Sequence, residues 1–212
     1  MIPFIEVRGS EKVQVLKVDR WTLKGVNLMT KGFKKMKNHR VLIIDKLHIS
    51  GDFELLSKEL QWLPWKNCPL KFIPSNFPAK NLVVIDMRKC DIHDFGLDQQ
   101  CCKSLKRLDL SDCKSLKITP NINGLQSLEF LLLNGCSSLR KIHPSIGNLC
   151  RLRLLNLRGC KKFMDPPSSI CQLKSLGWLV FSVCSSVKAL TVDFVVMPGL
   201  RTLCALEIDI QQ

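Results

Sequence analysis

The sequence lacks the short motifs by which enzymes and nucleotide-binding proteins are most often recognised. It contains no G-x-x-x-x-G-K-[ST] phosphate loop, no H-E-x-x-H metal motif and no G-x-S-x-G nucleophile turn. Only four histidines occur in 212 residues, and they are scattered, at His39, His48, His93 and His143. We therefore expect a protein that is not an enzyme, with no catalytic, cofactor-binding or metal-binding residues.

Signals for export and for membrane insertion are also missing. The first residues contain no basic segment followed by an apolar core of about 7 to 15 residues. The most apolar late stretch, residues 178–197, is interrupted by Lys188 and Asp193. No Asn-x-Ser/Thr glycosylation site occurs, and eleven cysteines cannot all pair within the chain. We expect a reducing compartment, the cytosol or the nucleus, and no membrane partner.

Acidic residues are scarce. The chain has 18 Asp and Glu against 32 Lys and Arg, a net charge of +14, and the excess is spread along its length. A nucleic-acid site usually appears as a concentrated basic stripe with a reading motif, and no zinc-finger spacing, basic zipper or aromatic RNA-binding signature is present. The charge therefore argues against nucleic acid as the partner and favours attraction to acidic protein surfaces.

The cysteines that are present form a regular series. Six of the eleven are separated by 22, 23, 23, 24 and 24 residues: Cys68, Cys90, Cys113, Cys136, Cys160 and Cys184. Each follows the same apolar frame, L-x-x-L-x-L-x-x-C, with a few apolar substitutions. A fixed period of about 20 to 50 residues indicates a repeat architecture, and this frame is that of the leucine-rich repeat.

The repeat predicts a leucine-rich repeat solenoid of the α/β class. In L-x-x-L-x-L the last two leucines are two residues apart, the period of a strand, so both point to one face. Parallel strands from successive repeats bury this row by stacking into a curved sheet on the concave face. Short helical or irregular turns that contain Pro120, Pro144 or Pro166 are expected on the convex face. We expect a linker with a first strand and a short helix in residues 1–38, about seven repeats in 39–199, and a degenerate last strand and tail in 200–212.

Two stretches resemble one family in particular. Residues 60–77, LQWLPWKNCPLKFIPSNF, are similar to the start of the leucine-rich region of plant disease-resistance proteins of the TIR-NB-ARC-LRR class. Residues 8–13, RGSEKV, and 32–38, GFKKMKN, resemble that family's linker between its nucleotide-binding module and its repeats. The resemblance implies a protein-interaction module of an intracellular plant immune receptor. Such a module serves the defence response by recognising a pathogen effector or a modified host protein, and it makes an autoinhibitory contact with a nucleotide-binding domain.

The sequence also departs from that family. It has no counterpart of the TIR domain or of the nucleotide-binding domain, so we expect a truncated receptor or an incomplete gene, and no bound cofactor. Gln61 stands where the family usually has Arg, and His39 stands where it has Leu. Any activity of the missing domains would not belong to this chain.

The residues between the leucines are expected to form an exposed concave surface. One position per repeat, directly before the second leucine, gives an aligned column that includes Trp62, Phe130 and Trp178. A contiguous exposed apolar patch usually marks an interaction site, and Trp and Arg are common anchors in such sites. The candidate protein-contact residues are Trp62, Val84, Arg88, Lys106, Arg107, Phe130, Leu132, Arg153, Leu154, Arg158 and Trp178.

Other interpretations remain open at this point. The same side chains could contact a domain absent from this chain, or could only support the sheet. The chain could instead be the substrate-binding repeat domain of an F-box ubiquitin ligase adaptor, although residues 1–38 are too short for an F-box helical bundle. An enzyme with its site in residues 1–38 or 188–212 would need a motif that neither segment contains.

Overall fold

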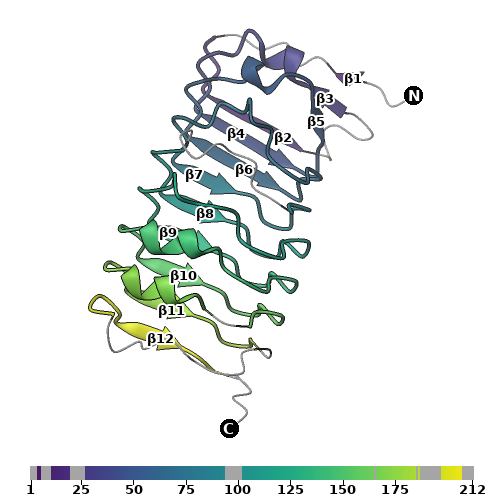
Figure 1. Cartoon of the computed structure of the whole chain (residues 1–212). Helices are drawn as coiled ribbons and strands as arrows, with labels where there is room; N and C mark the ends of the chain where they lie inside the picture. Colours follow the sequence, from purple (N-terminus) through teal and green to yellow (C-terminus); the bar gives the residue numbers. More distant parts are fainter. Residues whose placement is uncertain are drawn as a thin grey trace.

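The computed structural model describes residues 4–5, 11–19, 27–93, 102–164, 166–184, 186 and 197–206. These residues wind into an elongated solenoid whose coils stack along one axis (Figure 1). The main sheet has nine strands, every neighbouring pair of which is parallel, in the order β12-β11-β10-β9-β8-β7-β6-β4-β2. The predicted leucine-rich repeat solenoid is thereby confirmed. The strands are β2 Val15–Asp19, β4 Val41–Asp45, β6 Trp62–Lys66, β7 Val84–Asp86, β8 Arg107–Asp109, β9 Phe130–Leu132, β10 Leu154–Asn156, β11 Trp178–Val180 and β12 Thr202–Cys204.

A second, smaller sheet lies at the N-terminal end of the solenoid (Figure 1). It contains three short parallel strands in the order β1-β3-β5, which are Phe4–Ile5, Asn27–Met29 and Ile49–Ser50. Residues 15–19 and 27–29 therefore extend both sheets by one strand each, because β2 pairs with β4 while β3 pairs with β5. The sequence pattern assigned this segment to a linker with a first strand. The boundaries at residues 38 and 199 stay predictions.

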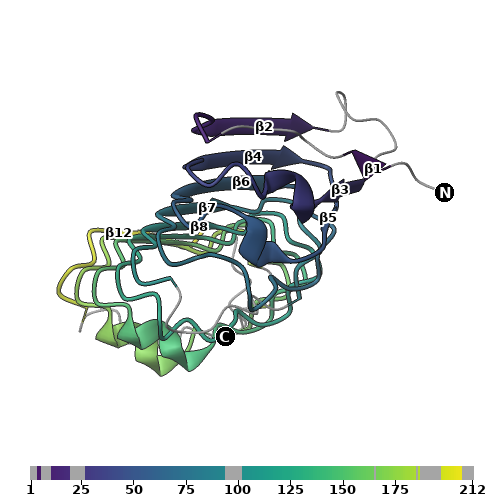
Figure 2. The same ribbon diagram turned by 90° about the horizontal axis from the view of Figure 1, so that it is seen from above.

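Four 3-10 helices in the described part of the chain close individual coils. They are η1 Thr30–Phe33, η2 Phe53–Leu55, η3 Pro144–Asn148 and η4 Ser168–Gln172. Seen from above, the helices of the later coils lie on the side opposite the main sheet (Figure 2). Two of the three predicted proline-containing turns are thus helical, whereas the segment that follows Pro120 forms turns without a helix.

Leucines of the repeat frame form the core. The middle leucine of each strand faces the same residue of the next strand, so that Leu108, Leu131 and Leu155 are consecutive partners. All three side chains are at most 1% exposed. Burial of one such side chain contributes about 1.5 to 3 kcal/mol, and each coil shares this contribution with both neighbours.

The cysteine series lines the core at the point where each coil leaves the sheet. The Cys136 thiol donates to the Leu110 carbonyl oxygen, 3.1 Å away in the preceding coil, and Cys160 donates in the same way to Leu133. Burial raises the pKa of Cys136 to about 12 and that of Cys184 to about 11. These thiols therefore stay protonated at neutral pH, and their role is that of weak hydrogen-bond donors between coils.

A tight turn that follows strands β4 and β6 to β11 is a feature that the leucine frame does not predict. One residue per coil has a positive φ of 53° to 73° in this turn: Lys46, Asn67, Lys89, Asp112, Gly135, Gly159 and Val183. The backbone amide of Asp112 donates to the Asn134 carbonyl of the next coil, and Gly135 donates in the same way to Arg158. The left-handed conformation thus aims one amide per coil at its neighbour, even where the residue is not glycine.

Candidate protein-contact surface

The outward side of the main sheet carries the predicted column, and we call this side the concave face. In-register pairing places the predicted residues side by side, in the order Trp62, Val84, Arg107, Phe130, Leu154 and Trp178. Trp62 and Trp178, at the two ends of this series, are 47% and 44% exposed. Val84, Phe130 and Leu154 between them are half-buried, so the two tryptophans are the most open apolar residues of this series. The column continues beyond Trp62 to Val41 and then to Val15, which is 59% exposed.

A second column runs beside the first, and two of its residues differ from expectation. Asp86, Leu132, Asn156 and Val180 are half-buried, but Pro64 and Asp109 are buried. The Asp109 carboxylate is covered by the side chains around it, since Ser111 donates to it and two arginines lie within 4 Å. Alternation along a strand predicts the direction of a side chain, but long neighbours from adjacent strands decide its exposure.

Arg88 and Arg107 form ion pairs with carboxylates of this face. The guanidinium of Arg88 donates twice to the Asp86 carboxylate, from Nε and from a terminal nitrogen, at 2.8 Å in both cases. Arg107 lies 3.6 Å from Asp109, and Lys66 lies 3.8 Å from Asp86. The two carboxylates therefore share three cations.

A smaller ion-pair network links the residues that directly precede β8, β9 and β10. Glu129 lies 3.8 Å from Lys106 and 3.5 Å from Arg153, which precede β8 and β10. Lys106 and Arg153 belong to the predicted contact residues, whereas Glu129 does not, although the sequence holds a signal for this grouping. Lys106, Glu129 and Arg153 are one repeat apart, so parallel stacking brings them together. Arg158, also predicted for the contact surface, is exposed at the end of β10.

The polar residues of the second column also shape the backbone. Asp86, Asp109 and Asn156 each accept a hydrogen bond from the amide two residues later, at Arg88, Ser111 and Arg158. This is the pattern of an Asx turn, which starts the chain on its way out of the sheet. Aspartate and asparagine at this position thus serve the fold as well as the surface.

We expect the Asp86 pair to make stability depend on acid pH. Burial alone would raise the pKa of Asp86, but hydrogen bonds and charge from Arg88 outweigh burial and lower it. Because the folded pKa lies below the unfolded one, the contribution is complete above about pH 4 and is lost as pH falls through the folded pKa. Arg88 is 41% exposed, so solvent limits this contribution to about 1 kcal/mol.

Urea unfolding of the wild type and of Asp86→Asn between pH 7 and pH 2.5 measures this dependence. The wild type should be the more stable at pH 7, and the difference should shrink as the pH falls below about 4. A difference that is constant across this range would show that the Asp86 pair is not the titrating element.

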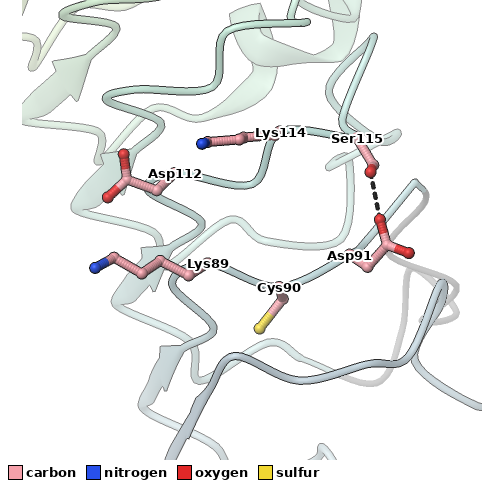
Figure 3. Close-up of a pocket in the computed structure, with 6 residues that line it drawn as sticks. All are labelled: Lys89, Cys90, Asp91, Asp112, Lys114 and Ser115. Carbon is pink, nitrogen blue, oxygen red and sulfur yellow. Dashed lines mark hydrogen bonds between the residues drawn. The ribbon is translucent and has the colours of Figure 1, made fainter. Parts of the chain in front are cut away.

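The hollows on the described surface include one on the concave face and one in the turns beside it. One, of about 450 Å³, is on the concave face between Trp62, Val84, Asp86, Arg88, Arg107 and Asp109. The other, of about 590 Å³, lies in the turns that leave the sheet and is lined by Lys89, Cys90, Asp91, Asp112, Lys114 and Ser115 (Figure 3). The Asp91 carboxylate there accepts a hydrogen bond from Ser115, and the lysines and aspartates alternate. Its mixed charges do not converge on one ligand type, and it lies outside the predicted contact column.

Two of the described histidines, His143 and His39, serve the fold. His143 accepts a hydrogen bond at Nδ1 from the Ser145 amide, 3.1 Å away, and so caps η3. His39 is buried, and burial lowers its pKa. Among the residues that the structure describes, no three His, Cys, Asp or Glu side chains are grouped so as to hold a metal ion. Lys188 and Asp193, which interrupt the apolar late stretch, lie outside the described residues. Among the described residues, no helix has the length and apolar character needed to cross a bilayer.

The stacked parallel coils, the leucine core and the exposed sheet define a leucine-rich repeat protein. Solved structures of this class superpose on it. The leucine-rich repeat domain of the type III effector XopL matches 76% of this chain and 66% of its own, with a TM-score of 0.59 and 22% identity. The *Leptospira interrogans* leucine-rich repeat protein LIC12759 matches 95% and 57%, with a TM-score of 0.64 and 18% identity.

The sequence relatives of the chain are plant TIR-NBS-LRR disease resistance proteins. Disease resistance-like protein DSC2 of *Arabidopsis thaliana* is 36% identical over 115 residues, which are 52% of this chain and 10% of that protein. Disease resistance protein RPP4 of the same plant is 34% identical over 160 residues, or 74% and 14%. TMV resistance protein N of *Nicotiana glutinosa* is 31% identical over 110 residues, or 52% and 10%. No protein-family model matches the sequence.

The chain spans about a tenth of the length of these relatives. The resemblance noted in the sequence is confirmed, and the names of the relatives favour the resistance-protein interpretation over the ubiquitin-ligase one. Leucine-rich repeat domains of resistance proteins are non-enzymatic interaction modules, so the relatives and the fold agree with the expectation that this chain is not an enzyme.

Proposed function

We propose that this chain is the protein-interaction module of an intracellular plant immune receptor and acts in the cytosol or the nucleus. Its concave face binds a pathogen effector, or a host protein that an effector has modified. In a receptor with a nucleotide-binding domain, the module also contacts that domain and holds it inactive. The observation that carries the proposal is the aligned column on the concave face, in which Trp62 and Trp178 are 47% and 44% exposed.

The size of this face supports a protein partner. Nine strands at about 4.8 Å span about 38 Å, and five residues at about 3.3 Å span about 17 Å. The resulting area of about 650 Å² approaches the ~800 Å² that one partner buries in a standard interface. The hollow on this face is open to solvent, unlike the enclosed pockets that bind small molecules.

The proposed coupling between ligand and receptor is a shift of equilibrium. If the inactive receptor covers the concave face, a ligand that prefers the uncovered face favours the active state by its difference in affinity for the two states. A ligand with equal affinity for both states would bind without activating. The module by itself supplies the binding part of this scheme.

Pull-down of the nucleotide-binding domain of a relative such as DSC2 tests the proposal. We expect the wild-type chain to bind, and Trp62→Ala and Trp178→Ala each to weaken binding about tenfold or more, as for buried aromatic anchors of an interface. Phe72→Ala is the matched control, because Phe72 is 61% exposed but lies outside the concave face. Equal binding by all four proteins would contradict the role of the concave face, and no binding by the wild type would contradict the autoinhibitory contact.

A further inference from the structure

The charges on the concave face form two layers, with the basic side chains outside the acidic ones. In every ion pair that the described residues form there, the cation is 41% to 60% exposed and the carboxylate only 7% to 21%. Asp109, the most covered carboxylate, lies under both Arg88 and Arg107. A partner that approaches this face therefore meets cations first, although acidic and basic residues occur side by side in the sheet.

The cations also outnumber the carboxylates. Lys66, Arg88, Arg107, Lys106 and Arg153 share three acids, Asp86, Asp109 and Glu129. The acids are further occupied within the fold, since Asp86 and Asp109 each hold an Asx turn. Lys106, Arg107 and Arg153 keep 45% to 60% of their side chains open, so they can accept an additional carboxylate without losing their present partners.

The apolar residues set the length of the occupant. Trp62 and Trp178 are five strand spacings apart, which is about 24 Å at ~4.8 Å per strand. A segment that touches both would need about 7 residues if extended or about 16 residues if helical. Arg107 and Phe130 lie in the same column between the two tryptophans, so the cations face the middle of such a segment.

We propose that the occupant of the concave face is an acidic polypeptide segment that lies across the strands. Its carboxylates pair with Lys106, Arg107 and Arg153, and its apolar side chains rest on Trp62 and Trp178 at the two ends. This inference rests on the proposed function of the face as a protein-contact surface. It adds the chemical class of the bound segment and its orientation across the strands.

The same layering favours a polypeptide over a nucleic acid. The five paired cations exceed their acids by only two charges, and the two exposed tryptophans are at the ends of the proposed site. A nucleic-acid backbone requires a continuous basic track, because each phosphate contact depends on its own cation. A segment with a few carboxylates between apolar side chains matches both the small charge excess and the two separate anchors.

Selection from a random library of 16-residue peptides displayed on phage tests the inference. The immobilised full chain is the target, and clones that also bind the Trp62→Ala/Trp178→Ala variant are discarded. The remaining peptides should carry net negative charge, with apolar residues toward both ends. Synthetic copies should bind the Arg107→Gln/Arg153→Gln variant about tenfold more weakly, and binding should weaken as NaCl rises from about 50 to 500 mM.

The controls test whether peptide binding depends on the cations of the concave face or on positive charge anywhere on the chain. Lys162→Gln/Lys174→Gln removes two exposed cations elsewhere and should bind the peptides like the wild type. Thermal unfolding checks that the arginine variant folds, which we expect because both arginines are at least 45% exposed. A labelled single-stranded and a labelled duplex DNA oligonucleotide should not compete with the peptides.

The outcomes distinguish this inference from the proposed function. Tryptophan-dependent peptides that are neutral or basic, or that bind the arginine variant as well as the wild type, would overturn the acidic occupant and leave a protein-contact face. Displacement of the peptides by DNA would overturn it in favour of nucleic acid. If no selected peptide depends on the two tryptophans, the protein-contact role of the concave face fails as well.

Discussion

Leu131→Ala should lower the free energy of unfolding by about 2 to 5 kcal/mol, whereas Leu132→Ala should lower it by about 0.5 kcal/mol or less. Leu131 is 1% exposed and stacks between Leu108 and Leu155 of the adjacent coils. Leu132 is the next residue along β9, but it points to the concave face and is only half-buried. The two variants therefore carry the same substitution at neighbouring residues that lie on opposite faces of the sheet.

Urea denaturation at neutral pH measures both values. Truncation at Leu131 leaves a cavity between coils, which relaxation fills only in part because the neighbouring leucines are held by their own strands. Truncation at Leu132 removes surface that water already reaches. A larger loss for Leu132 than for Leu131 would mean that the register of the strands is shifted by one residue.

Trp65→Ala should cost about 3 to 5 kcal/mol, one of the two largest effects that we expect. Trp65 is 1% exposed, its ring lies 6.3 Å from that of Phe53, and its Nε1 donates to the Leu47 carbonyl at 3.1 Å. The substitution removes a large buried side chain and also leaves the carbonyl of Leu47 without this donor.

Trp62→Ala serves as the matched control for Trp65→Ala. Both tryptophans belong to β6, but Trp62 is 47% exposed, so we expect a loss of less than about 1 kcal/mol. Thermal or urea unfolding followed by circular dichroism compares the two variants. If Trp62→Ala destabilised the chain as much as Trp65→Ala, Trp62 would be a core residue and could not anchor a partner.

The repeat frame predicted the architecture because its physical basis is local and periodic. Leu108, Leu131 and Leu155 are core residues in the structure as in the sequence pattern, since each stands two residues before a further apolar residue that points the same way. The Cys136 thiol, at the repeated cysteine position, donates to the Leu110 carbonyl of the preceding coil. A signal repeated six times outweighs substitutions in any single coil.

The pattern was less informative where coils interact through long polar side chains. The position of Arg88 in its repeat does not show that its guanidinium donates two hydrogen bonds to the Asp86 carboxylate, or that Asp109 lies beneath it. Burial of Pro64 depends in the same way on neighbours from adjacent strands. The sequence contains no signal for the positive φ of Val183. This conformation accompanies the hydrogen bond that the Val183 amide donates to the Leu206 carbonyl of the next coil.

Hydroxyl-radical labelling with and without a bound partner tests the central claim most directly. In the free chain, Trp62, Trp178 and Phe72 are each more than 40% exposed, so all three should be oxidised. With the nucleotide-binding domain or a selected peptide bound, we predict protection of Trp62 and Trp178 and unchanged oxidation of Phe72, which lies outside the concave face. Protection of Phe72 with both tryptophans still oxidised would contradict the assignment of the concave face as the contact surface.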